Sequence, residues 1–244
     1  MANFVLVHGA WHGAWCWSRV CPALIRAGHN AHAVTLTGVG ERAHLLSRNI
    51  TLQTHINDVL GLIEAEELHD IVLVVHSYGG IVGTGVANQL AAGRVKHICY
   101  IDAVLPKPGE AWGSGHSTAV REQRISAAAA TEHNAIPAPS PQAWGLMGAD
   151  ADWVRRRMTD HPAAPYTEPL HFDTTKLAAI GRTYLSCIAP SSPTIDPSRR
   201  RALDPQFWDG AWLPGSRNID LATGHDAMVS APQVLIPIML ECAA

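Results

Sequence analysis

The sequence predicts an α/β protein with a mostly parallel, six-stranded sheet that helices cover on both faces. Short runs rich in Val, Ile and Leu, with no polar alternation, are typical of strands buried on both faces. Stretches with helical periodicity separate these runs, and such alternation favours a parallel sheet. One long stretch in the middle of the chain breaks the alternation and predicts an insertion. The 244 residues fit one domain of this kind.

Each element follows from a local pattern. Thr51 stands where it would cap the second helix, and the helical stretches lie between the strands. We expect strands at residues 4–8, 31–36, 71–76, 97–103, 183–187 and 217–221. We expect helices at residues 17–27, 52–66, 80–92 and 232–241.

Residues 106–175 form the insertion, and they are rich in proline and large aromatic residues. Its aromatic residues include Trp112, Trp144, Trp153, Tyr166 and Phe172. Tryptophans exposed on a mobile loop would be costly apolar surface, so a packed segment is favoured over a loose one. We expect residues 106–175 to form a helical lid over a core made of residues 1–105 and 176–244.

Ser77 ends the apolar run 71–76 and is followed by Tyr78, Gly79 and Gly80. A buried strand that meets a serine and paired glycines is typical of a strained strand–turn–helix elbow that exposes the serine Oγ. The usual G-x-S-x-G pattern has glycine where this chain has Val75. A serine after a strand is also an ordinary turn residue, so the hypothesis of a nucleophile depends on two further segments.

The first of these segments is the loop His8-Gly9-Ala10 after the first strand. Acyl transfer needs two backbone N–H groups directed at the developing oxyanion. One would come from Tyr78, which follows the serine, and the other from this early loop. A Gly-rich turn that only leads into a helix is the alternative interpretation.

The second segment is Gly224-His225, which lies between the last strand and the last helix. The chain has 14 histidines, so a single histidine means little by itself. A late histidine after an earlier nucleophile is, however, the order found in one class of serine hydrolases. Together the three segments indicate acyl-transfer chemistry.

At these residues the chain resembles the α/β-hydrolase superfamily, in the branch of plant methylesterases, hydroxynitrile lyases and small bacterial esterases. The segments that carry the resemblance are FVLVHGAWHGAWCW, LTGVGERAHL, VLVVHSYGGIV, YIDAVLPKPGE and TGHDAMVSAPQVL, which extend over most of the chain outside the insertion. The resemblance implies the α/β-hydrolase fold, with Ser77 as nucleophile, His225 as base, and the Ala10 and Tyr78 amides as oxyanion hole.

The resemblance also implies an activity, namely serine hydrolysis of small carboxylic esters or carbamates through an acyl-enzyme. LTGVGER and GHDAM are similar to the bacterial members, some of which cleave xenobiotic esters and carbamates. The length and opening residues are also similar to those of hydrolases of the benzimidazole methylcarbamate carbendazim.

The catalytic acid is where the sequence departs from the branch. The plant members carry it after the penultimate strand, where this chain has Pro190. Asp102 ends the strand after the nucleophile, where another group of α/β-hydrolases has its acid, and we prefer it. Asp196 lies in the expected loop but is also placed to cap a helix. Asp226 is a third candidate, although adjacent side chains such as Asp226 and His225 rarely face each other.

The same fold offers other functions as alternatives to an esterase. Hydroxynitrile lyases of this branch carry a threonine and a lysine where this chain has Gly9 and Asp226. Without that lysine, the site has no cation to stabilise a leaving cyanide, which disfavours lyase activity. A cofactor-free oxygenase and a non-catalytic small-molecule receptor are the remaining alternatives. Trp11, Trp112 and Trp144, with Trp15, are candidates for binding a flat or aromatic substrate.

The composition limits partners and location. A net charge of −3 predicts no nucleic-acid or membrane partner, and the substrate is expected to be a small molecule. Five cysteines without a signal peptide favour the cytoplasm. We expect neither a metal nor another cofactor, and a homodimer is compatible with the sequence. The arginine runs 155–157 and 199–201 are expected to be solvated helix faces.

Overall fold

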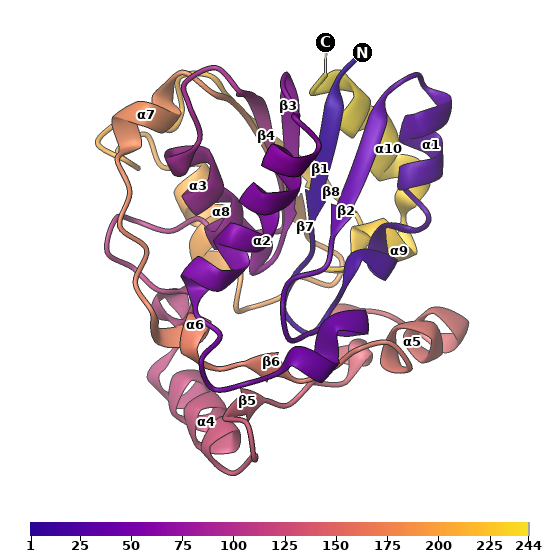
Figure 1. Cartoon of the computed structure of the whole chain (residues 1–244), viewed down its shortest axis with the longest axis vertical. Helices are drawn as coiled ribbons and strands as arrows, with labels where there is room; N and C mark the ends of the chain where they lie inside the picture. The colour runs from indigo at the N-terminus through magenta and orange to yellow at the C-terminus, as the bar shows by residue number, and fades with distance from the viewer. Residues whose placement is uncertain (244) are drawn as a thin grey trace.

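Six parallel strands form the central sheet of the computed structural model, in the spatial order β2-β1-β3-β4-β7-β8 (Figure 1). The model describes residues 1–243, so Ala244, the last residue of the predicted core, lies outside the described residues. All six predicted strands are present. Their bounds are β1 Asn3–Val7, β2 Asn30–Val34, β3 Ile71–His76, β4 Val95–Ile101, β7 Gly181–Cys187 and β8 Ser216–Leu221.

The predicted helices are also present, with one correction. The helix expected at 17–27 is a 3₁₀ turn, η1 Ala14–Trp17, followed by the shorter α1 Cys21–Arg26, because Pro22 begins a new α-helix in its first turn. Thr51 caps its helix as expected, through a side-chain hydrogen bond from the Thr54 amide. The other main-body helices are α2 Leu52–Ala65, α3 Gly79–Gln89, α8 Asp196–Ala202, α9 Ala227–Ser230 and α10 Pro232–Glu241, with η2 Gly40–Leu45 before α2.

The sheet separates two hydrophobic cores because successive side chains of a strand point to opposite faces. On one face, Val5 and Leu73 pack in the same core as residues of α2 and α3. On the other face, Phe4 and Val72 pack in the same core as residues of α1 and α10. Figure 1 shows these two helical layers on either side of the strands. A doubly covered parallel sheet therefore leaves the carboxyl ends of the strands as the place for a site.

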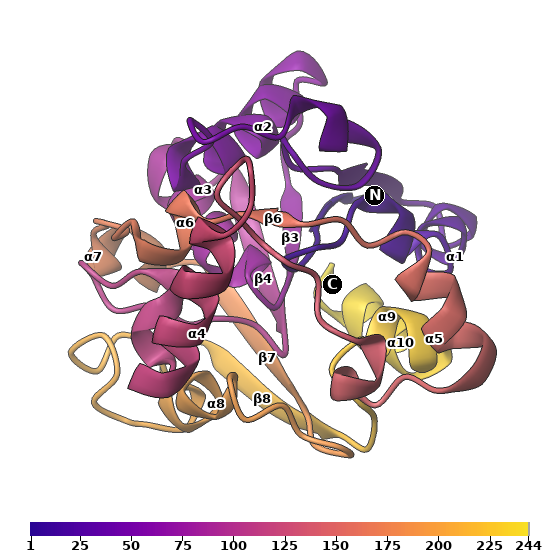
Figure 2. The ribbon, with the colours of Figure 1, turned by 90° about the horizontal axis from the view of Figure 1, so that it is seen from below.

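Most of residues 106–175 lies across the carboxyl ends of the strands, at the bottom of Figure 1 and toward the viewer in Figure 2. The last part of this inserted segment runs back to α7 Thr174–Ala178, at the upper left of Figure 1. It contains short helices and one small antiparallel pair of strands. Its elements are η3 Trp112–Gly115, α4 Thr118–Ala129, β5 Ala135–Ile136, η4 Pro141–Trp144, α5 Gly148–Arg155, β6 His161–Pro162 and α6 Ala164–Thr167, and α7 Thr174–Ala178 leads back to the sheet.

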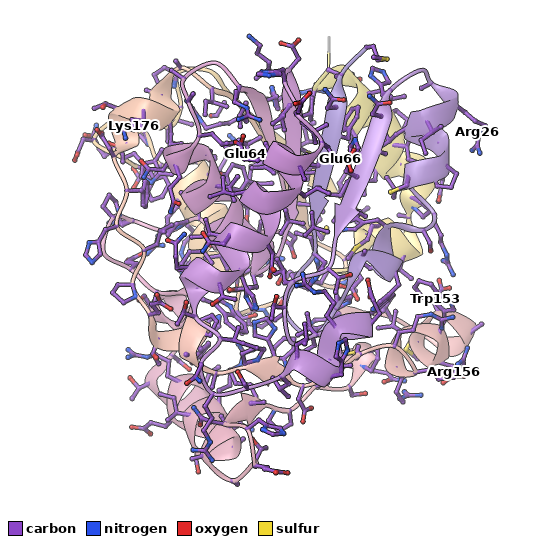
Figure 3. The ribbon with its side chains drawn as sticks, viewed as in Figure 1. Arg26, Glu64, Glu66, Trp153, Arg156 and Lys176 are labelled. Atoms are coloured by element: carbon purple, nitrogen blue, oxygen red, sulfur yellow. The ribbon has the colours of Figure 1, made fainter. Side chains whose placement is uncertain are left out.

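The outer surface of the inserted segment carries one of the arginine runs. Figure 3 labels Trp153 and Arg156 on α5, at the edge of the molecule. Arg155 and Arg156 are exposed, as expected for a solvated helix face. Within the described residues, no helix has the length and apolarity needed to cross a membrane.

Candidate active site

Ser77 occupies the sharp turn between β3 and α3, with a backbone φ of 51°. This left-handed conformation is strained for a residue with a Cβ, and such strain is often found at functional sites. Two backbone hydrogen bonds connect the turn to the last residue of β4 and to the chain that follows it. The Ser77 amide donates to the Ile101 carbonyl (3.3 Å), and the Val104 amide donates to the Ser77 carbonyl (2.9 Å). The Ser77 side chain remains half-buried at the carboxyl end of the sheet.

Glycines after Ser77 allow the turn to pack closely against its neighbours. A Cβ on Gly80 would lie 2.2 Å from the Val104 carbonyl oxygen, and one on Gly79 would lie 2.8 Å from the His8 carbonyl oxygen. Val75 stands where the common motif has glycine, and its Cγ1 would lie 2.4 Å from a Cβ on Gly83. The space for close packing of strand and helix is therefore supplied by Gly83 on the helix.

The early loop lies directly beside Ser77. A Cβ on Gly9 would be 2.8 Å from the Ser77 Cβ, so the loop passes within van der Waals contact of the serine. Within residues 1–243, the buried backbone amides of Ala10 and Tyr78 make no hydrogen bond to another protein group. Buried amides without partners are rare, and two of them beside a strained serine are suited to donate hydrogen bonds to an oxyanion.

His225 and Asp102 meet at the same end of the sheet. Asp102, fully buried after β4 with a φ of 44°, lies with its Oδ2 2.7 Å from the His225 Nδ1. Since an ionised carboxylate only accepts hydrogen bonds, Nδ1 carries the proton and Nε2 keeps a lone pair. The His225 backbone is held by the inserted segment, because its amide donates to the Trp144 carbonyl (3.2 Å).

Arg199 is the residue that the sequence analysis missed. Its Nε and Nη2 donate to the two oxygens of Asp102 at 2.9 and 2.8 Å, so the arginine balances the buried carboxylate. The expectation that the 199–201 run is a solvated face was therefore wrong. Arg201 is also paired, with Glu110 at 2.7 Å. No sequence signal distinguishes Arg199 from its two neighbours, because the pairing depends on how α8 docks.

Asp196 lies away from the imidazole and pairs with Arg199 instead, at 2.6 Å. Its side chain is 43% exposed. The idea that it caps α8 was wrong, because it is the first residue of the helix and Ile195 occupies the cap position without a side-chain bond.

Asp226 faces the early loop rather than His225. Its Oδ2 lies 3.2 Å from the His12 Nε2, and both side chains are buried. The Nδ1 of His12 lies 2.8 Å from the Ala10 carbonyl oxygen. Both nitrogens of His12 thus face oxygens that only accept, which requires an imidazolium ion. The result is a buried ion pair that joins the loop of Ala10 to the loop of His225.

The pKa shifts of these groups agree with that geometry. Burial alone would lower the pKa of His12, but the charge and hydrogen bond of Asp226 raise it overall. Burial opposes ionisation of Asp226, yet the charge of His12 lowers the pKa of that carboxyl to about 2. Burial, and then the charge of His225, holds the pKa of His76 well below its ordinary value. His76 is therefore neutral, and its Nε2 donates to the His225 carbonyl at 3.0 Å.

Potential metal ligands also gather here. Ligand atoms of His76, His225 and Asp226 lie within 4.8 Å of one another. The Nε2 of His76 donates to a carbonyl, and the Oδ2 of Asp226 pairs with His12, whereas the Oδ1 of Asp226 and the Nδ1 of His76 have no hydrogen-bond partner among the described residues.

Three tryptophans of the predicted substrate site surround the serine turn. The Trp11 ring lies 5.7 Å from Trp112 and 5.8 Å from Trp144, measured between ring centroids. Trp112 lies 4.9 Å from Tyr78, and Trp144 lies 6.1 Å from His225. Trp15 is different, because it packs against His12 and Trp153 on the flank.

Comparison with known proteins places the chain in a hydrolase family. A family model described as the alpha/beta hydrolase family matches residues 4–238. The chain is 42% identical over 243 residues to the carbendazim hydrolyzing esterase of Nocardioides sp. (strain SG-4G), which covers 96% of this chain and 97% of that protein. It is 25% identical to esterase PIR7B of rice, over 99% of this chain and 95% of that one.

A solved structure supports the fold independently. The extracellular alpha/beta-hydrolase from a Paenibacillus species superposes with a TM-score of 0.81 over 99% of both chains. The sequence identity is 22%, so this likeness concerns the fold alone.

Proposed function

Because this chain belongs to the alpha/beta hydrolase family, we propose that it is a serine esterase that cleaves small carboxylic esters or carbamates. Ser77 attacks the carbonyl carbon and passes its proton to the Nε2 of His225. The imidazolium then donates that proton to the leaving alcohol or amine. A water molecule repeats the sequence on the acyl-enzyme and releases the acid.

The other roles follow from charge. Asp102 orients His225 and stabilises its cation, and Arg199 holds both oxygens of Asp102. The amides of Ala10 and Tyr78 stabilise the oxyanion. The observation that carries the proposal is the 2.7 Å hydrogen bond from His225 Nδ1 to buried Asp102, because it leaves Nε2 free to act as a base.

The substrate class is proposed from the aromatic surroundings and from one relative. Trp11, Trp112 and Trp144 are suited to a flat or aromatic group. The relative at 42% identity is named for hydrolysing carbendazim. We therefore extend the proposal to aryl esters and aryl carbamates, including xenobiotic ones.

Three further expectations belong to this proposal. Residues 106–175 act as a lid, which is supported by the contact of Trp144 with the His225 loop. The five free cysteines favour a reducing compartment such as the cytoplasm. A homodimer stays a prediction.

The test is turnover of a panel of methyl and aryl esters and carbamates, followed by product mass. Ser77→Ala should abolish acyl-enzyme formation, with a residual rate of roughly 10³–10⁴ over water from oxyanion stabilisation and binding. Ser18→Ala removes an exposed serine and is the matched control. Near-normal turnover by Ser77→Ala would refute the serine mechanism.

A further inference from the structure

A hollow of about 360 Å³ lies between the inserted segment and the early loop. Trp11 forms one wall, α4 contributes Val120 and Arg124, and Ile136 and Thr194 close other sides. This volume is within the usual range for small-molecule sites, and most of the lining is apolar. Arg124 is the one charged residue of the lining.

Arg124 is held in place by aromatic rings. Its guanidinium carbon lies 5.2 Å from the ring of Trp11, 5.3 Å from Trp112 and 5.5 Å from Tyr166. Contacts of this kind attract a cation and fix its plane, but the rings offer no hydrogen-bond acceptor to most of its N–H groups.

The hydrogen bonding of Arg124 is incomplete. Among the described residues no carboxylate lies within 4.0 Å of its guanidinium, although arginines such as Arg199 and Arg201 have such partners. Its Nη1 is 3.5 Å from the Nδ1 of His116, and that nitrogen is already hydrogen-bonded with the Tyr166 hydroxyl at 2.7 Å.

The electrostatic surroundings do not supply the missing negative charge. Burial lowers the pKa of Arg124, while Tyr166 acts to raise it, and the side chain is half-buried. Burial, and then the charges of Arg124 and Arg121, lower the pKa of His116 to about 3, so its ring is neutral. A half-buried arginine with N–H groups that no carboxylate occupies can donate charge-assisted hydrogen bonds to an incoming acceptor.

Trp11 links the hollow to the proposed reaction centre. It lines the hollow and directly follows Ala10, whose amide is proposed for the oxyanion hole. Trp112, the second indole beside Arg124, lies 4.9 Å from the side-chain ring of Tyr78. A substrate that extends past Trp11 would place one end in the hollow and its carbonyl at Ser77.

We propose that this hollow is a substrate subsite in which Arg124 selects an aromatic group bearing a hydrogen-bond acceptor, with a carboxylate bound most strongly. The inference rests on the proposed esterase function for the position of the scissile carbonyl. The apolar walls receive the ring, and the guanidinium pairs with the acceptor at its far edge.

Two methyl esters of similar shape test the turnover consequence. Monomethyl terephthalate carries a carboxylate opposite its ester, and methyl 4-methylbenzoate carries a methyl group there. The wild-type kcat/KM should favour the first ester, and Arg124→Met should reduce that preference about tenfold or more through KM. Arg124→Lys should keep part of the preference. Arg121→Met, a change of an exposed arginine on the same helix, should retain all of it.

Binding separates this proposal from the esterase proposal. Ser77→Ala should bind benzoate more tightly than benzyl alcohol in calorimetric titration, and the added Arg124→Met change should abolish the difference. This result is expected even if no ester is turned over, in which case only the esterase proposal fails. Equal binding of the two probes, or equal losses on both esters in Arg124→Met and Arg124→Lys, would overturn the subsite.

Discussion

Two buried carboxylates lie near the imidazole of His225, and each has its own cation. Asp102 is balanced by Arg199, and Asp226 is balanced by His12. Two uncompensated carboxylates at this depth would be strongly destabilising. Because Asp226 pairs with His12, Asp102 is the carboxylate that is hydrogen-bonded to the His225 ring.

The assignment of the acid leads to a prediction about Asp102. Asp102→Asn should lower kcat by about 10⁴ with little change in substrate binding, because an amide favours the wrong tautomer of His225. Asp196→Asn should change kcat little, because Asp196 does not contact the imidazole and pairs with Arg199 through a side chain that is 43% exposed. Steady-state kinetics of both variants is the measurement. The reverse ranking would transfer the role to Asp196.

The ion pair of His12 and Asp226 should contribute to stability. Asp226→Asn should lower the free energy of unfolding by about 3–5 kcal/mol, because it leaves a buried imidazolium without its partner. Asp152→Asn, which removes an exposed pair with Arg155, is the control and should be nearly neutral. Urea unfolding of the two variants compares them directly.

The pH dependence of that loss has a definite sign. Because the pKa of Asp226 is lowered in the folded chain, its contribution to stability is present above pH 3.8 and is lost as the pH falls toward 2. Because the pKa of His12 is raised, its contribution is present below pH 6.5 and is lost as the pH rises through the raised pKa of His12. The difference in the free energy of unfolding between wild type and Asp226→Asn should therefore be largest between these two pH limits. A difference independent of pH would contradict the ion pair.

At the scale of elements, the turn between β3 and α3 depends on the close approach of backbones. Glycine at position 80 is needed for contact with the segment after β4, and Gly83 accommodates Val75. The turn thus presents Ser77 because strand, helix and neighbouring loop all approach within contact distance.

Glycine substitutions in two helices test this dependence. Gly80→Ala should disrupt the turn, because its Cβ would lie 2.2 Å from the Val104 carbonyl oxygen. We expect a lower melting temperature together with loss of turnover. Gly61→Ala in α2 meets nothing within 4 Å and should stabilise the helix by about 0.5–1 kcal/mol. An active and stable Gly80→Ala variant would show that the turn tolerates displacement.

At the scale of the whole molecule, several histidines are buried in the neutral form. Burial lowers the pKa of His8 to about 3, that of His55 to about 4 and that of His116 to about 3. The unfolded chain binds these protons near pH 6.5, so it holds more protons than the folded chain below that pH. Stability must therefore fall as the pH drops from about 6.5 toward 4, by about 1.4 kcal/mol per pH unit for each such group.

Urea midpoints measured from pH 8 to pH 5 should show this acid sensitivity. His55→Gln should reduce the slope below pH 6.5, because it removes one group while keeping a donor and an acceptor for Thr37 and Tyr78. His69→Gln, at an exposed position, should leave the slope unchanged. Identical slopes in the two variants would argue against the buried neutral histidine at 55.

The strands, the main helices, the serine turn and the late histidine could be predicted from the amino-acid sequence. These features depend on local periodicity, on glycines adjacent to a serine, and on chain order, all of which can be read along the chain. Asp102 could be preferred over Asp196 only by its place after a strand.

The tertiary structure decided which charges meet. Arg199 approaches Asp102 because α8 docks beside the end of β4, and His12 approaches Asp226 because two loops that are distant in sequence converge at the carboxyl ends of the strands. Arg124 faces a hollow because α4 folds back over Trp11. Burial and pairing of charges arise from contacts between remote segments, and no local pattern in the chain encodes those contacts.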